Sequence, residues 1–415
     1  MPRGGRRRSL RVDPVRRRHK PDYMLLLLSV ILLTVGLVVV YAISPGLSSQ
    51  NHVSENYYVS KQLVAIVLGI AAFIVTSQLP ITWWRRLEKP LIYAAVAAAL
   101  AVRLFGVRIN GAYRWVQIGG FSFQAAELIK FALLVWLAGF LTDRLRSGPL
   151  DESSKTLKPI LVALLVIGVI VAKIQSDLGS TGVMVIMMAA MVYVAGMPLR
   201  RLAMAGGVVL VATALLISTS SYRRARFDTF LHPAQDCQST GYQACQALIA
   251  VGSGGVIGLG LGRDVQAYGY LPEAANDSIF AIMAEKFGFI GVASLLGLFV
   301  AFFARLKKII ERAPDDYSRF LVVGILAWLS TQAMINIGAM IGLLPLKGIT
   351  LPFISSGGTS LLFITAAVGL AFQVSRYTTF GASTTSFQNE RGDRHDNSID
   401  GRRLRGAYHP GLERR

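Results

Sequence analysis

The stretch from Tyr23 to Ile43, YMLLLLSVILLTVGLVVVYAI, has no charged side chain and is long enough to cross a membrane. A helix of about 20 mostly apolar residues spans the roughly 30 Å hydrocarbon layer and satisfies its own backbone hydrogen bonds there. The stretch lacks a small-residue cleavage site, so we expect it to remain as a span and not to be removed as a signal peptide. It therefore predicts an integral membrane protein.

Nine further segments have a similar length and apolar character. They begin near Lys61, Leu91, Phe123, Pro159, Thr181, Leu202, Ser278, Arg319 and Ser355. The composition agrees, because 53% of the 415 residues are hydrophobic and only 16% are charged, which is too apolar for a water-soluble protein of this length. The sequence predicts an all-α membrane protein, a polytopic bundle of about ten transmembrane helices with both termini on one side.

The net charge of +20 follows the alternation of the predicted spans. Lys and Arg concentrate in alternate short connections and in the tails, which is typical of cytoplasmic segments and not of a nucleic-acid-binding face. We therefore expect a multi-pass protein of the cytoplasmic membrane that binds no nucleic acid. Its parts would be a basic cytoplasmic tail (1–20), a transmembrane domain (21–378) and a disordered cytoplasmic tail (379–415). Two interpretations of the basic tails stay open: solvated segments, or segments that contact anionic membrane lipid.

With this orientation, the connection 219–277 is a large extracytoplasmic loop between spans 7 and 8. Loops of this length usually carry function. Cys237 and Cys245 lie in it, where an oxidising environment would allow a disulfide, although two unpaired cysteines are an equal alternative. The glycine-rich stretch 252–262 has no preceding strand, so it favours tight turns and close packing over a dinucleotide site.

The loop ends in Tyr270 to Phe280, YLPEAANDSIF, where carboxylates meet the start of an apolar helix. Desolvation at the edge of hydrocarbon favours the protonated form of Asp277, so this group could exchange a proton near neutral pH. That is the property of a general base. Asp277 is the leading candidate for chemistry, with Glu273 beside it.

Polar residues at membrane depth are costly unless they are paired or line a wet cavity. Glu127 and Lys130, three residues apart, can pair on one helix as a structural salt bridge; alternatively, Lys130 faces a cavity and meets an anionic substrate or Asp277. Asp177 is expected to cap a helix. Arg114, beside Trp115, suits an interfacial anchor and a phosphate contact equally well.

The segment from Leu344 to Ser360, LPLKGITLPFISSGGTS, is too polar and too rich in Pro and Gly to be a plain span. It predicts a re-entrant or interfacial segment that leads into the last helix, whose N-terminal amides could receive an anion. Lys347 lies in this segment.

Four ordered motifs together resemble the SEDS family of peptidoglycan polymerases, which includes FtsW, RodA and SpoVE. They are Gly111 to Trp115 running into Gln124 to Lys130, Gln175 to Gly179, Tyr242 to Gly291, and Pro345 to Ser360. The resemblance covers most of the membrane region. The Lys347-Gly348 and Thr350 to Phe353 residues look more like the division member than the elongation member.

The resemblance implies an inverting glycosyltransferase that polymerises lipid II at the outer face of the cytoplasmic membrane, at the division septum. It implies that Asp277 is the general base. Binding of the substrate and its pyrophosphate would fall to Lys130, Glu127, Arg114 and Lys347, and supporting roles to Gln124, Asp177, Glu273, Ser355 and Thr359. Mg²⁺ or Mn²⁺ could share the neutralisation of the pyrophosphate, although no dedicated metal-ligand cluster is visible in the sequence.

The implied partners are lipid II, a class B penicillin-binding protein with transpeptidase activity, and other division proteins of the membrane. Two other functions stay open. A lipid II flippase would use a charged path across the whole membrane without making a bond. A non-catalytic division scaffold would tolerate substitution of Asp277.

Overall fold

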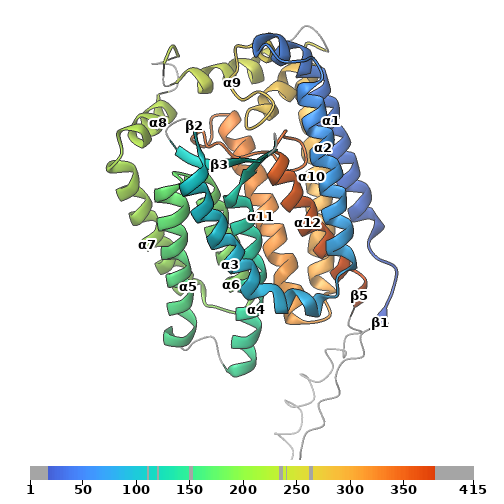
Figure 1. Ribbon diagram of the computed structural model, residues 1–415, viewed down its shortest axis with the longest axis vertical. Helices are drawn as coiled ribbons and strands as arrows, with labels where there is room; N and C mark the ends of the chain where they lie inside the picture. The colour runs from blue at the N-terminus through green and yellow to red at the C-terminus, as the bar shows by residue number, and fades with distance from the viewer. Residues whose placement is uncertain are drawn as a thin grey trace, which may run out of the picture. The chain divides into compact units, whose positions relative to one another are not determined.

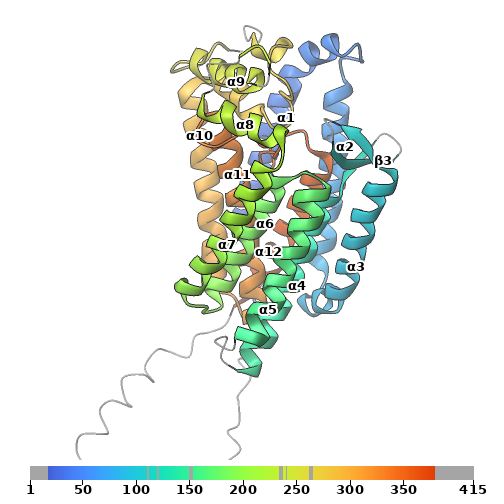
Figure 2. The ribbon, with the colours of Figure 1, turned by 90° about the vertical axis from the view of Figure 1, so that its left-hand side faces the viewer.

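The computed structural model describes residues 17–109, 112–118, 121–148, 153–232, 237–239, 241–260 and 265–378. Arg16–Thr378 form one compact unit. A helix occupies each of the ten predicted apolar segments, and most of these helices run along the long axis of the unit (Figures 1 and 2). They are α1 (Tyr23–Gln50), α2 (Tyr57–Gln78), α3 (Ile81–Phe105), α4 (Ala125–Ser147), α5 (Ser153–Ile167) with the π-helical η1 (Gly168–Ile174), α6 (Leu178–Val194), α7 (Leu199–Ser218), α10 (Ile279–Glu311), α11 (Asp316–Met340) and α12 (Gly358–Val374).

Among the described residues, seven helices are both long and apolar enough to cross a membrane. These are α1, α2, α4, the continuous stretch Lys155–Ala172, α7, α10 and α11. Helices α6 and α12 are apolar but only 17 residues long. Charged side chains such as Arg85 and Glu88 lower the hydropathy of the first third of helix α3. The structure thus supports a multi-pass helical protein with seven candidate spans among the described residues, and the expected count of about ten stays a prediction.

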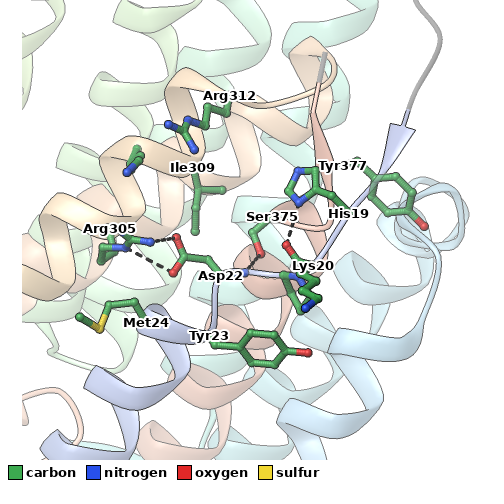
Figure 3. Close-up of a pocket in the computed structure, with 12 residues that line it drawn as sticks. His19, Lys20, Asp22, Tyr23, Met24, Arg305, Ile309, Arg312, Ser375 and Tyr377 are labelled. Atoms are coloured by element: carbon green, nitrogen blue, oxygen red, sulfur yellow. Dashed lines mark hydrogen bonds and ion pairs between the residues drawn. The ribbon is translucent and has the colours of Figure 1, made fainter. Parts of the chain in front are cut away.

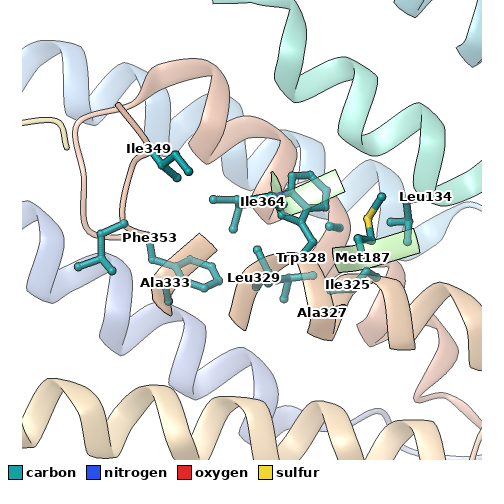
Figure 4. Packing of buried hydrophobic residues seen from close by; sticks show 14 of the residues in the cluster. Leu134, Met187, Ile325, Ala327, Trp328, Leu329, Ala333, Ile349, Phe353 and Ile364 are labelled. Carbon is teal, nitrogen blue, oxygen red and sulfur yellow. The ribbon is translucent and has the colours of Figure 1, made fainter. Parts of the chain in front are cut away.

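The bundle has a central helix and a lipid-facing surround. Of the most apolar part of α11, 72% is buried by other helices, whereas none of the corresponding part of α7 is buried. Trp328 of α11 lies in one buried cluster with Leu134 of α4 and Met187 of α6 (Figure 4). Ile349 and Phe353, from the segment before α12, belong to the same cluster. The central helix therefore contacts the irregular segment directly.

A small antiparallel sheet interrupts the otherwise helical fold, which is all-α as predicted. Strands β2 (Val107–Ile109), β3 (Ala112–Ile118) and β4 (Phe121–Gln124) pair in the order β2-β3-β4 between α3 and α4. Phe123 of β4 packs on Phe363 of α12, with ring centroids 6.5 Å apart. Strands this short show little periodicity in the sequence, so the sequence did not predict them.

The connection 219–277 folds as a partly helical cap at one end of the bundle (Figure 2). It contains α8 (Ser221–Leu231), α9 (Tyr242–Ser253) and the short η2 (Gln266–Tyr268). Cys237 and Cys245 form a disulfide that closes the turn before α9. Ser239, between the two cysteines, lies in that turn.

The described part of the glycine-rich stretch forms tight turns, as the sequence predicted, and it packs against a kink in α10. The amide of Gly260 donates to the carbonyl of Lys286 at 3.0 Å, and the amide of Phe289 donates to the carbonyl of Gly255 at 2.9 Å. Gly258 has a φ of +84°, and a Cβ atom on it would lie only 2.2 Å from the Lys286 carbonyl oxygen. Glycine is therefore required at position 258 for both backbone conformation and space.

The two ends of the described chain lie together at the opposite end of the bundle. Strand β1 (Arg17–Arg18) pairs antiparallel with β5 (Tyr377–Thr378) (Figure 1). This pairing agrees with termini on one side. Most of the predicted basic tail 1–20, and all of the tail 379–415, lie outside the described residues.

The packing of Gly258 predicts that Gly258→Ala destabilises the protein by at least about 2 kcal/mol, because the substitution strains the backbone and causes a clash. Thermal unfolding in detergent, followed by tryptophan fluorescence, measures the effect. The matched control is Gly252→Ala in α9, where an added Cβ meets nothing within 4 Å and should not lower the midpoint. An unchanged midpoint for Gly258→Ala would contradict the packing described.

Candidate functional site

Two irregular segments meet at the end of α11 and bring Asp277 beside Gly348, which follows Lys347 in the chain. The first is the loop 269–278 that precedes α10, and the second is the segment 341–357 that precedes α12. The amide of Ser356 donates to the carbonyl of Ala275 at 2.8 Å. The predicted re-entrant or interfacial segment is thus present as non-helical chain, and it contacts the loop that carries the proposed base.

The side chain of Asn336, on α11, joins the two segments. Its Nδ2 atom donates to the carbonyls of Asp277 and Ile349, both at 2.7 Å. Asn336 is 1% exposed, so these hydrogen bonds lie away from water. A buried carbonyl without a partner costs about 1–3 kcal/mol, and one amide prevents that cost in both segments.

Gln332 lies one turn before Asn336 on α11 and acts on the same segment. Its Nε2 atom donates to the carbonyl of Thr350 at 3.0 Å, and its Oε1 atom accepts from Trp328 and from Lys130, each at 2.9 Å. Residues four apart share one face of a helix. This face of α11 therefore holds the segment that contains Lys347.

The carboxylate of Asp277 is partly buried at the junction. Its Oδ1 atom is shielded from solvent and accepts no hydrogen bond from the described part of the chain. Burial raises the pKa of Asp277 to about 7, and the negative charge of Glu273 contributes in the same direction. Arg226 and Gln243 oppose the rise. At neutral pH the carboxyl group can both accept and release a proton, as predicted for a base.

A cationic pocket adjoins Asp277. Its charged lining consists of four basic side chains and one carboxylate: Arg114, Arg223, Arg226, Lys347 and Asp177. Gly348 also lines it, and a Cβ atom on Gly348 would lie 3.6 Å from Asp277 Oδ2. Burial lowers the pKa of Lys347, and the charges of Arg226 and Arg223 lower it further. The clustered positive charge suits a pyrophosphate, which would stabilise all four cations.

The pocket is small, with a cavity volume of about 30 Å³. Two of its cations are held by backbone carbonyls. Arg114 donates to Gln175 at 3.0 Å and Ser176 at 2.7 Å, and Arg223 donates to Leu216 and Ala172 at 3.1 and 2.8 Å. Arg114 thus fixes the η1–α6 turn and also lines the pocket.

The residues that line this pocket do not include Lys130 or Glu127, so its geometry gives no support to their predicted contact with pyrophosphate. Lys130 Nζ lies 2.7 Å from Glu127 Oε1, and the two residues are 1% and 3% exposed. Lys130 also lies 5.2 Å from the ring centroid of Trp328. Two charges buried this deeply are costly unless they are paired. Lys130 donates both to Glu127 and to Gln332. The described contacts of Lys130 do not include Asp277, and the structural salt bridge is the interpretation that the structure favours.

The predicted supporting residues join elements around the site. Asp177 caps α6 as expected, because its Oδ1 accepts from the Ser180 amide at 2.9 Å. The amide of Gln124 donates to Thr359 Oγ1, and the Gln124 side chain donates to Asp177 Oδ2. Thr359 in turn donates to the carbonyl of Ser122. Within the two irregular segments, Ser355 accepts from the Leu351 amide, and Glu273 accepts from Asn276.

Sequence reasoning missed five residues at the site: Gln243, Arg223, Arg226, Gln332 and Asn336. Gln332 and Asn336 could have been found, because they are polar side chains four residues apart inside an apolar helix. Arg223 and Arg226 gave no such signal, since basic residues in an exposed loop are ordinary. Only the folding of α8 beside η1 brings them to Lys347.

A metal site has little support in the described residues. They contain no group of three or more His, Cys, Asp or Glu side chains placed to hold an ion. Asp177 already caps a helix, and the cationic pocket supplies positive charge at the same place. The expected Mg²⁺ or Mn²⁺ stays a prediction, and no step below depends on it.

Comparison with known proteins identifies the family. Residues 23–380 match the FTSW_RODA_SPOVE family model, described as "Cell cycle protein". The chain belongs to this family. It is 35% identical over 362 residues to stage V sporulation protein E of Bacillus subtilis, covering 87% of this chain and 98% of that protein. It is 37% identical over 358 residues to a probable peptidoglycan glycosyltransferase FtsW of Saccharophagus degradans, covering 85% and 92%.

Solved structures of family members share the fold. The chain aligns with a protein from a peptidoglycan synthase complex, described as coordinating polymerization and crosslinking, with a TM-score of 0.70 and 28% identity. That alignment covers 86% of this chain and 98% of the other. The rod shape determining protein RodA of Thermus thermophilus aligns with a TM-score of 0.63 at 28% identity, covering 86% and 97%. The chain therefore shares the fold of these solved structures over nearly its whole membrane region.

The bridging role of Asn336 predicts that Asn336→Leu loosens both irregular segments. Two buried carbonyls lose their donor, at about 1–3 kcal/mol each, so amide hydrogen exchange in 270–278 and 345–357 should quicken by about tenfold or more. Ser330→Ala on the same helix, whose hydroxyl bonds only Ala327, is the matched control. Unchanged exchange in either segment of Asn336→Leu would show that the bridge does not hold that segment.

Proposed function

We propose that this chain is a peptidoglycan glycosyltransferase that polymerises lipid II at the outer face of the cytoplasmic membrane during septal wall synthesis. One observation carries the proposal: Asp277, a carboxyl group with a pKa of about 7, adjoins a pocket of four basic side chains. The relatives named as probable peptidoglycan glycosyltransferase FtsW support it. In this proposal about ten spans cross the membrane, with both termini in the cytoplasm.

The proposed reaction transfers a glycan strand between two lipid-linked sugars. The hydroxyl oxygen of lipid II attacks the anomeric carbon of the strand, the bond from that carbon to the pyrophosphate oxygen breaks, and the configuration inverts. Asp277 accepts the hydroxyl proton, which makes the oxygen a better nucleophile as the bond forms. The negative charge leaves on the polyprenyl pyrophosphate, where Lys347, Arg114, Arg223 and Arg226 neutralise it.

Lys130 and Glu127 support the reaction at a distance in this proposal. The buried pair contacts Gln332, which binds the backbone of the segment that carries Lys347. Their substitution is expected to displace Lys347 and not to remove a group that touches substrate. The role is that of positioning residues.

The partner expected for the product is a class B penicillin-binding protein that crosslinks the strands, together with other membrane proteins of division. The similarity to a protein from a synthase complex that both polymerises and crosslinks supports this partner. The flippase alternative has less support, because the buried charges Lys130 and Glu127 bind each other and do not line an open path. The scaffold alternative differs in its prediction for Asp277.

The role of Asp277 as base predicts that Asp277→Asn lowers the rate of lipid II polymerisation by about 100-fold or more, while the protein stays folded and membrane-inserted. The assay uses the purified full chain, alone and with its transpeptidase, and labelled lipid II, with strand length measured on a gel. Asp228→Asn in α8, which removes an exposed carboxylate from the same loop, is the matched control and should retain activity. Near-normal strands from Asp277→Asn would remove the residue from the mechanism.

The charges around Asp277 predict opposite shifts in pH dependence. The base must be ionised, so kcat/KM should rise with pH through about 7 and level off above it. Glu273→Gln removes a negative charge, lowers the pKa of Asp277 and should move the midpoint to lower pH, whereas Arg226→Gln should move it to higher pH. The pH profile of kcat/KM for each variant measures the shifts. Two midpoints equal to that of the wild type would exclude Asp277 as the titrating group.

A further inference from the structure

A second charged cavity lies at the other end of the bundle, where the two ends of the described chain meet. It has a volume of about 260 Å³ and opens between the residues that precede α1, the C-terminal turn of α10 and the end of α12 (Figure 3). Asp277 and the cationic pocket are not part of it. Nothing in the proposed glycosyl transfer uses its residues.

The cavity walls are fixed by backbone contacts between distant parts of the chain. The amide of His19 donates to the carbonyl of Arg376 at 2.9 Å, and the amide of Asp22 donates to Ser375 Oγ at 3.0 Å. Strands β1 and β5 continue this contact. The cavity is therefore a built feature of the fold and not a gap beside a single loop.

Positive charge dominates the lining. Four basic side chains, Lys20, Arg305, Lys308 and Arg312, face one carboxylate, Asp22. Asp22 is already committed to Arg305, at 2.6 and 3.3 Å, and it also caps α1 by accepting from the Leu25 amide. The other three cations have no carboxylate partner among the described residues that line the cavity. An anion would compensate this excess.

The rim of the cavity is apolar on the side of α1. Tyr23 is 59% exposed and Met24 is 49% exposed, both lining the cavity, and exposed Leu27 follows one turn further along the helix. On α10, Val300 is exposed five residues before Arg305. A molecule with a charged head and apolar chains would thus meet cations in the cavity and hydrocarbon-compatible side chains beside it.

We propose that this cavity binds the phosphodiester headgroup of an anionic phospholipid of the inner leaflet. Lys308, Arg312 and Lys20 bind the phosphate, and the acyl chains lie along the exposed faces of α1 and α10. A free phosphate ion shares the headgroup's charge chemistry but would make no use of the apolar rim. The bound lipid would join the start of α1 to the ends of α10 and α12.

The test compares lipids and variants with the purified full chain in detergent. Native mass spectrometry measures binding of phosphatidylglycerol and of zwitterionic phosphatidylcholine, each with and without added inorganic phosphate. The variant is Lys308→Gln with Arg312→Gln, which leaves the Asp22–Arg305 pair intact. The matched control is Arg86→Gln with Lys307→Gln, which removes two exposed charges at the same end of the bundle but outside the cavity.

We expect the wild type to prefer phosphatidylglycerol, and the cavity variant to bind it about 30-fold more weakly, at about 1 kcal/mol for each basic residue removed. The control pair should bind like the wild type. Equal binding by the cavity variant would overturn the proposal, and so would an equal loss in the control, which would mean that diffuse charge attracts the lipid. Displacement of the lipid by inorganic phosphate at matched concentration would identify the ion as the ligand and also overturn it.

Discussion

The hydrogen bonds from Gln332 and Asn336 to irregular backbone are the constraint on which the site depends. Non-helical chain among packed apolar helices must find partners for its amides and carbonyls, because water is scarce there. Two amide side chains on one face of α11 meet this need for the loop before α10 and the segment before α12. Together with the Ser356–Ala275 hydrogen bond, they fix the loop that carries Asp277 relative to the segment that carries Lys347. The position of the proposed chemistry thus follows from backbone hydrogen bonding.

The second constraint is electrostatic. Asp277 lies close to cations, which lower the pKa of a carboxyl group, yet burial and Glu273 together outweigh them. A fully solvated carboxylate would be ionised at neutral pH but a weak base, and a more deeply buried one would stay protonated. The edge position gives an intermediate affinity for the proton. Lys347 is affected by its surroundings in the opposite sense, because burial and its arginine neighbours lower its pKa.

The buried pair of Lys130 and Glu127 connects the apolar interior to the site. Desolvation of two charges is costly, so such a pair is weak evidence for stability and better evidence for a defined arrangement. Here the arrangement continues through Gln332 to Thr350, within the segment that carries Lys347. At the far end of α10, a different set of cations surrounds a larger cavity beside the lipid-facing surface. The bundle therefore presents basic pockets at both ends, each fitted to a different phosphate-bearing molecule in our proposals.

The sequence by itself determined the membrane environment, the positions of the helices and the identity of Asp277 as the leading acid. Those features depend on local composition: an apolar run of sufficient length folds as a helix in lipid, and a carboxyl group at its start is conspicuous. The tertiary structure decided which charges share a pocket. Lys130 looked equally suited to substrate and to Glu127 until the burial of both became known, while Arg223 and Arg226 looked like ordinary loop cations until α8 folded against η1. Pocket membership depends on contacts between residues far apart in the chain, and a sequence pattern with a period of a few residues carries no information about them.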